Sequence, residues 1–172
     1  PQLHSTRILF RGGTPLKIAL LLVGYGHVAQ RFVQLLDESR PALSALGIEP
    51  VIVGVTTRRH GAAFDAAGLD ASRLADALRP GAPVPASARF IGDALARLPV
   101  DQIRVVVETT TLDVRSGEPA ISHVRAGLAG GAHVITANKG PVAFAYRALA
   151  AEAEAARRSF LFEGAVMDGV PI

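Results

Sequence analysis

Apolar stretches of strand length alternate with helical patterns along this 172-residue chain. The first stretch, "KIALLLVG" at residues 17–24, is a continuous apolar run that ends in glycine. Runs of this kind are typical of central parallel strands, which are covered by helices on both faces. The alternation therefore predicts an α/β fold, a doubly wound parallel sheet with right-handed crossovers. The predicted strands are residues 17–24, 50–57, 103–110, 132–138 and 159–166.

The segments between these strands carry helical periodicity. A helix is predicted over residues 27–40, with Val28, Phe32, Leu35 and Leu36 on one apolar face. It is predicted to break near Arg40, before a proline, and a short second helical piece is predicted to follow. Proline near the start of a segment and glycine just past its end mark the limits of the later helices. These helices are predicted at residues 72–78, 118–131 and 141–158, and the Pro/Gly-rich residues 79–87 are predicted to form a connector.

The composition excludes several classes of protein. Hydrophobic residues make up 49% of the chain and charged residues 19%, which indicates a globular domain and not a disordered segment. There is no cysteine, so disulfides, thiolate metal sites and a cysteine nucleophile are excluded, and a cytoplasmic location is compatible with the sequence. A net charge of +3 with dispersed arginines argues against nucleic-acid binding, and no apolar run approaches the roughly 20 residues that span a membrane. We expect a small-molecule ligand.

A glycine motif, "GYGHVA", joins the first predicted strand to the first predicted helix. Gly24 allows a tight turn, Gly26 lets the backbone approach a pyrophosphate, and the small Ala29 permits close packing of the helix on the strand. The amino terminus of the helix presents free N–H groups to the phosphates. Within a strand–helix–strand unit this motif predicts a Rossmann-like dinucleotide site, whereas an isolated motif is more often a simple turn. His27 is included in the candidate site, with an exposed loop position as the alternative.

The end of the second predicted strand indicates which dinucleotide binds. A carboxylate that would hold the ribose of NAD is absent between Thr56 and Gly61. Arg58 and Arg59 occupy this segment instead, and their guanidinium groups suit a ribose 2′-phosphate in charge and in bidentate geometry. The sequence therefore favours NADP over NAD, with Arg58 ahead of Arg59 because it lies closer to the strand. Solvated loop arginines, and with them NAD, remain the alternative.

Polar residues also follow the third and fourth predicted strands. Thr109, Thr110 and Thr111 place hydroxyl groups at the carboxyl edge of the sheet, where doubly wound folds bind ligands, although threonines are also common within strands. Lys139 lies at the same edge, after the fourth strand. Its ammonium could neutralise a substrate carboxylate or take part in proton transfer at a hydroxyl or carbonyl carbon. A solvated turn lysine is the alternative, and the position favours the functional interpretation.

Two longer motifs give the chain a family resemblance. The segment "TANKGPVA", followed by "FLFEGAVMDGVPI", resembles the homoserine dehydrogenases, and so does the block from "ETTTLD" to "TANKGPVA". The resemblance covers roughly residues 17–172. It implies an NAD(P)-dependent enzyme that interconverts aspartate-4-semialdehyde and homoserine by hydride transfer to or from the nicotinamide.

The resemblance also implies roles for single residues. Lys139 matches the catalytic family lysine beside nicotinamide and substrate, and Thr109 or Thr110 matches a cofactor-contacting position, as does Val28. The motif "EGAVMDGV" implies a site for an alkali cation such as sodium, although Ala165 stands where a threonine is common. Carbonyl-rich oxygen ligation suits a hard cation, and the alternative is that the glutamate of this motif caps or pairs locally. The implied ligands are Glu163, Val166, Asp168 and Val170.

The resemblance further implies how the chain is divided. We predict a lead-in segment at residues 1–16 and a dinucleotide-binding domain at residues 17–172, with the start of a substrate domain near residues 163–172. The rest of the family's substrate domain is expected beyond Ile172, so this segment alone is expected to show little turnover. The family pairs through that domain and the nearby sheet, which leaves a homo-oligomer open. The alternatives are a stand-alone dinucleotide-binding or sensor module, and a relative that acts on another amino-acid aldehyde or on aspartate.

Overall fold

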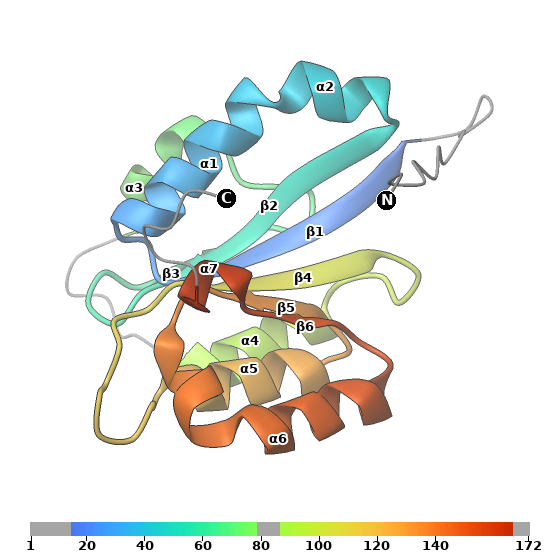
Figure 1. Cartoon of the computed structure of the whole chain (residues 1–172). Coiled ribbons are helices and arrows are strands. Elements are labelled where there is room, and N and C mark those ends of the chain that lie inside the picture. Colours follow the sequence, from blue (N-terminus) through green and yellow to red (C-terminus); the bar gives the residue numbers. More distant parts are fainter. Residues whose placement is uncertain (1–14, 79–86, 167–172) are drawn as a thin grey trace, which may run out of the picture.

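The computed structural model describes residues 15–78 and 87–166, and within them one sheet forms the centre of the molecule (Figure 1). Its strand order is β3-β2-β1-β4-β5-β6, and all neighbouring strands are parallel except β2 and β3, which are antiparallel. This order is that of a Rossmann-like doubly wound sheet, so the predicted fold class is confirmed, with one antiparallel strand at an edge. The strands are β1 (Leu16–Val23), β2 (Ile48–Thr56), β3 (Ala62–Phe64), β4 (Ile103–Glu108), β5 (His133–Thr136) and β6 (Phe160–Leu161).

Helices cover both faces of this sheet, as the continuous apolar run of β1 predicts (Figure 1). Ala19, Leu21 and Val23 of β1 pack into the core under α4, α5 and α6. Leu20 and Leu22 pack into the second core, under α1 and α3. The helices are α1 (His27–Glu38), α2 (Arg40–Ala45), α3 (Leu74–Ala77, preceded by a 3-10 turn at Ala71–Arg73), α4 (Ser87–Ala96), α5 (Ala120–Ala129), α6 (Lys139–Ala156) and α7 (Glu163–Val166).

Three elements, β3, α4 and α7, were not among the predicted ones. β3 has three half-buried residues, and alternation cannot identify so short a strand. α4 begins where the connector at residues 79–87 was expected to end, and the rest of that connector lies outside the described residues. Ile91, Ala94 and Leu95 form the buried face of α4 at helical spacing. Ala94 is small and Leu95 lies between two alanines, so the apolar face of this helix is difficult to recognise in the sequence.

The strand predicted at residues 159–166 is wrong in its second half. Only Phe160 and Leu161 pair with β5. The carboxylate of Glu163 then accepts a hydrogen bond from the N–H of Phe162 (3.1 Å), and α7 begins. A carboxylate at a helix start satisfies N–H groups that have no helical acceptor, which favours a helix over continued pairing at the sheet edge. The helix predicted at residues 72–78 is similarly a 3-10 turn followed by the short α3.

The buried face of α1 is only partly the predicted one: Phe32 and Leu36 pack half-buried against the core, but Val28 and Leu35 do not. Val28 and Leu35 are 56% and 45% exposed, whereas Ala29 is fully buried and Val33 is 7% exposed. Because the side chain of Ala29 is small, this position of the helix can approach the strands closely. Val33 lies one helical turn after Ala29, on the same face of α1, and also faces the core. Val28 and Leu35 therefore lie on the outer side of α1.

The close approach of α5 to the sheet leads to a prediction about stability. A Cβ atom at Gly127 would lie 2.8 Å from a methyl of Val134 and 3.2 Å from a methyl of Val106. We expect Gly127→Ala to lower the free energy of unfolding by about 1–3 kcal/mol, in spite of the higher helix propensity of alanine. Gly92→Ala in α4 is the matched control, because a Cβ there meets nothing within 4 Å. It should raise the free energy of unfolding by about 0.5–1 kcal/mol. Denaturant unfolding measures both, and a stabilised Gly127→Ala protein would contradict this packing.

Candidate functional site

Four parallel strands end in one row at the carboxyl edge of the sheet. Val23, the last residue of β1, is in register with Thr56 of β2 and with Glu108 of β4. Glu108 is in turn in register with Thr136, the last residue of β5. The segments that follow these residues leave the sheet side by side. The structure thus brings the glycine motif, the arginine pair, the threonines and the lysine to the same edge.

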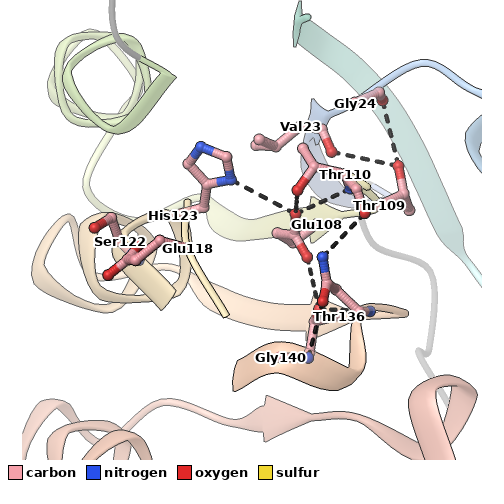
Figure 2. Close-up of polar contacts among 11 residues, drawn as sticks. Val23, Gly24, Glu108, Thr109, Thr110, Glu118, Ser122, His123, Thr136 and Gly140 are labelled. Carbon is pink, nitrogen blue, oxygen red and sulfur yellow. Dashed lines mark hydrogen bonds and ion pairs between the residues drawn. The ribbon is translucent and has the colours of Figure 1, made fainter. Parts of the chain in front are cut away.

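Gly24 forms a turn that requires glycine. Its φ angle is +93°, and its N–H donates to the carbonyl of Thr56 (2.8 Å). A Cβ atom at this position would lie 2.9 Å from the carbonyl oxygen of Thr109. Thr109 is itself held to β1, since its N–H donates to the carbonyl of Val23 (2.8 Å) and its hydroxyl lies 3.3 Å from the same oxygen (Figure 2). The turn is therefore fixed between β2 and β4.

The protein itself does not require a glycine at position 26. Gly26 is the N-cap of α1 in an extended conformation, and a Cβ atom on it would meet nothing within 4 Å. The N–H of Gln30 donates to the carbonyl of Gly26 (2.9 Å), so the N–H groups earlier in this turn have no helical acceptor. No acidic residue lies in the first turn, and His27 and Val28 are exposed. The start of α1 therefore suits an anionic ligand.

Two titratable groups flank the edge without belonging to the predicted site. Tyr25, between the two glycines of the motif, packs against the core under α1, and burial raises the pKa of its phenol. Asp113, in the segment after β4, accepts hydrogen bonds from the N–H groups of Arg115 (2.8 Å) and Ser116 (3.0 Å), which lower the pKa of its carboxyl. At neutral pH the phenol is therefore uncharged and the carboxylate is ionised.

Glu108 is a candidate residue that the sequence patterns did not single out. Its side chain is fully buried at the end of β4. Oε1 accepts hydrogen bonds from the N–H (3.0 Å) and the hydroxyl of Thr110, and Oε2 accepts one from the hydroxyl of Thr136 (2.8 Å) (Figure 2). His123 of α5 is also buried, with Nδ1 3.5 Å from Oε1. An acidic residue directly after three valines is the signal that could have identified Glu108, because an acidic group in an apolar strand needs partners.

Asn138 connects the end of β5 with the end of β4. Its side-chain nitrogen donates to the carbonyl of Thr110 (3.0 Å), and its side-chain oxygen accepts from the N–H of Gly140 (2.9 Å) as the N-cap of α6. Its own N–H donates to the hydroxyl of Thr136 (3.0 Å). Lys139 is the first residue of α6 and is exposed. It lies between two residues whose polar groups are engaged, so the backbone of Lys139 is fixed beside the end of β4.

Arg58 and Arg59 lie in the hairpin that connects β2 with β3, and both are exposed. The hairpin is closed by Thr57, whose N–H donates to the carbonyl of Gly61 (2.9 Å). The hydroxyl of Thr57 accepts from the N–H of His60 (2.8 Å). Because β3 pairs with β2, the two arginines are part of a short hydrogen-bonded connection and not of a long loop.

The implied metal ligands are only partly within the described residues, because Asp168 and Val170 lie outside them. Glu163 and Val166 are the first and last residues of α7. Glu163 is exposed, and its contact with the N–H of Phe162 is the local capping that was the alternative. Within residues 15–78 and 87–166, no three or more His, Cys, Asp or Glu side chains gather around a metal-sized space. A site of one carboxylate and several carbonyls would not form such a group.

A hollow on the surface of the protein lies apart from the candidate residues. A hollow of about 710 Å³ lies between α1, the first residues of β2 and residues 67–72. None of the candidate residues lines it, so this hollow does not indicate the site. No helix in the described part of the chain combines the length and the apolar character that crossing a membrane requires.

The fold and the carboxyl edge of its sheet define an α/β dinucleotide-binding domain. The glycine turn and the start of α1, whose first N–H groups have no helical acceptor, lie where the strand order reverses. Residues 24–163 match the family model described as the NAD binding domain of homoserine dehydrogenase. The chain belongs to the homoserine dehydrogenase NAD-binding domain family, and the resemblance found in the sequence is confirmed.

Two similar proteins are named as homoserine dehydrogenases. The NAD(+)-dependent homoserine dehydrogenase of Pseudomonas canavaninivorans is 36% identical over 159 residues, which cover 89% of this chain and 44% of that protein. The homoserine dehydrogenase of Methanocaldococcus jannaschii is 29% identical over 158 residues, which cover 89% of this chain and 46% of that protein. The chain thus spans less than half the length of these relatives.

Solved structures share the fold. Homoserine dehydrogenase from Thermoplasma acidophilum superposes with a TM-score of 0.71 at 22% identity, over 91% of this chain and 46% of that one. A hyperthermophilic archaeal homoserine dehydrogenase in complex with NADPH superposes with a TM-score of 0.67 at 20% identity, over the same shares of the two chains. At these identities the likeness supports the architecture alone.

The two glycines of the motif should differ in their effect on stability. Gly24→Ala places a Cβ atom against the carbonyl of Thr109 in a backbone conformation that favours glycine, so the free energy of unfolding should fall by about 2–4 kcal/mol. Gly26→Ala meets open space at an ordinary backbone conformation and should change it by less than about 0.5 kcal/mol. Thermal or denaturant unfolding of both variants measures the difference. Equal losses would show that the turn is not fixed as described.

Proposed function

We propose that this chain is the cofactor-binding part of a homoserine dehydrogenase, which interconverts aspartate-4-semialdehyde and homoserine with a nicotinamide dinucleotide. The observation that carries this proposal is the common row in which β1, β2, β4 and β5 end, since it brings the candidate residues to one edge. The family match supports the class of reaction. When bound, the cofactor supplies the carbon that gives or accepts the hydride.

The residues at the edge fit a dinucleotide. The open space beside Gly26 and the N–H groups of His27 and Val28 would hold the phosphates at the positive end of α1. Thr109 and Thr110 follow β4 next to the glycine turn and would form the adjoining wall. The fixed backbone of this turn means that little ordering is required on binding, which favours affinity.

Lys139 is the residue that we assign as catalytic. It is exposed at the first position of α6, and a lysine ammonium is a compact positive charge on a flexible stem. A positive charge at this edge would stabilise the oxygen of the semialdehyde as negative charge develops on it. In the reverse direction, Lys139 would help to move the proton of the homoserine hydroxyl. The neighbouring Asn138 cap holds the backbone from which this side chain extends.

We favour NADP as the cofactor, because Arg58 and Arg59 follow β2 and no carboxylate does. Both dinucleotides occur in the names of similar proteins: the relative from Pseudomonas canavaninivorans is named as NAD(+)-dependent, and the hyperthermophilic archaeal enzyme is described with NADPH. The position of the two arginines in a closed hairpin supports a fixed contact with a 2′-phosphate.

An alkali cation at Glu163, Val166, Asp168 and Val170 is also part of the proposal. The donors at the described positions fit a hard cation, since Glu163 offers an exposed carboxylate and the carbonyl of Val166 ends a helix. Such an ion would hold the end of α7 and the residues after it together. Chloride salts of sodium and of a large organic cation at equal ionic strength would separate specific binding from screening, by their effect on the melting temperature.

Titration with NADPH and NADH checks the choice of cofactor. We expect the chain to bind NADPH more tightly, and Arg58→Ala to weaken NADPH by about tenfold while it leaves NADH nearly unchanged, because one charge-assisted contact is lost. Gly26→Ala is the control, since a methyl group at the phosphate cradle should weaken both dinucleotides equally without loss of fold. Equal weakening of both by Arg58→Ala would remove the argument for a 2′-phosphate contact.

Turnover should be low in the 172-residue chain even where the cofactor binds. Hydride transfer requires a substrate held at reacting distance, and the chain spans less than half the length of its relatives. We expect tight NADPH binding together with oxidation of NADPH, in the presence of aspartate-4-semialdehyde, that is barely above the rate without protein. Sustained turnover of tens per second, an ordinary enzymatic rate, would show that these residues form a complete active site.

A further inference from the structure

The buried carboxylate of Glu108 belongs to a closed ring of hydrogen bonds (Figure 2). From Glu108, the ring passes to the hydroxyl of Thr136 (2.8 Å) and from there to the N–H of Asn138 (3.0 Å). The side-chain nitrogen of Asn138 donates to the carbonyl of Thr110 (3.0 Å). The N–H of Thr110 returns to Glu108 (3.0 Å) and closes the ring. Four residues from β4, β5 and the start of α6 are thereby joined.

The direction of each hydrogen bond in the ring is defined. A backbone N–H can only donate, so Thr136 accepts from Asn138 and directs its own hydroxyl proton to Glu108. Thr110 likewise donates its N–H to the other carboxyl oxygen of Glu108. Both oxygens of Glu108 therefore act as acceptors, and no neutral amide or apolar side chain of the same size reproduces this pattern.

We propose that Glu108 is a positioning residue, which through this ring fixes Lys139 at the start of α6 relative to the cofactor wall at Thr109–Thr110. The inference rests on the proposed function of this edge. Lys139 lies between Asn138, a member of the ring, and Gly140, whose N–H is held by the oxygen of Asn138 (2.9 Å). The same carboxylate is thus linked to Thr110 on one side of the site and, through Thr136 and Asn138, to the start of α6 on the other.

Contacts on two sides of α6 set the position of its first residues, and the ring provides one of them. A Cβ atom at Gly140 would lie 2.7 Å from Cα of Gly117, so α6 begins in close contact with the segment before α5. This contact limits movement toward Gly117, and the bond from Asn138 to Thr110 limits movement away from β4. A pair of valines at positions 108 and 136 could join the strands by apolar packing, but it would hold neither Thr110 nor Asn138.

The conservative test is Thr136→Val, which keeps the shape of the side chain and removes two bonds of the ring. Thr56→Val is the matched control: Thr56 is also fully buried at the end of a parallel strand, and its hydroxyl has no hydrogen-bond partner within the described residues. In the full 172-residue chain, Thr136→Val should weaken NADPH by about three- to tenfold. It should also accelerate the hydrogen exchange of the Gly140 amide, as measured by NMR. Thr56→Val should change neither quantity.

A second control distinguishes a positioning role of the ring from a purely structural one. Ile91→Val lowers stability from α4, far from the edge in sequence, and at an equal loss of melting temperature it should leave NADPH affinity unchanged. If Thr136→Val accelerates exchange at Gly140 but leaves NADPH affinity at the wild-type value, the ring is structural only and the proposal is overturned. Unchanged exchange at Gly140 overturns it as well.

Failure of the proposed function gives a different result. A wild-type chain that binds neither NADPH nor NADH contradicts the dinucleotide site itself. Exchange at Gly140 in Thr136→Val then decides by itself whether Glu108 fixes the start of α6. Glu108→Gln is a second test of the same ring. The glutamine amide places an N–H donor opposite the hydroxyl of Thr136 or the N–H of Thr110, and both of these groups are donors themselves. This variant should accelerate exchange at Gly140 at least as much as Thr136→Val.

Discussion

The alignment of four strand ends is the constraint on which the rest of the structure depends. Parallel pairing in register puts Thr56, Val23, Glu108 and Thr136 in one row. Each following segment starts from a fixed point, and two of the connections are short: three residues separate β1 from α1, and two separate β5 from α6. Connections of this length have little conformational freedom, so the edge is organised before a ligand arrives.

The sequence predicted the parts of the fold that long apolar runs determine. β1 and β4 were found because continuous runs of aliphatic residues mark buried parallel strands, and the edge followed from where those runs end. β3 and α7 were not found, because both are short and depend on partners: β3 on pairing with β2, and α7 on the contact of Glu163 with Phe162. On α1, Phe32 and Leu36 were found but the burial of Ala29 was not, because periodicity favours large apolar residues over alanine.

The candidate site was predictable to the same degree and for the same reason. The order of elements places Lys139 and the threonines at one edge whatever their side chains do. What holds them there was not predictable, since Glu108 and Thr136 are 28 positions apart and meet only through pairing of β4 with β5. A buried carboxylate costs solvation free energy and is tolerated where several donors compensate it. Here the compensating donors are the residues that form the edge.

The three small residues of the glycine motif have different physical origins, and this difference gives the motif its meaning. Gly24 is required by a turn against the carbonyl of Thr109, and Ala29 by the packing of α1 on the strands. Both would be selected in a protein of this fold that binds nothing. Gly26 has an ordinary backbone conformation and no atom of the described residues near its Cβ position, so neither strain nor packing explains it. A glycine without an internal reason, at the start of a helix and on the edge where four strands end, agrees with the proposal that a ligand approaches the backbone closely there.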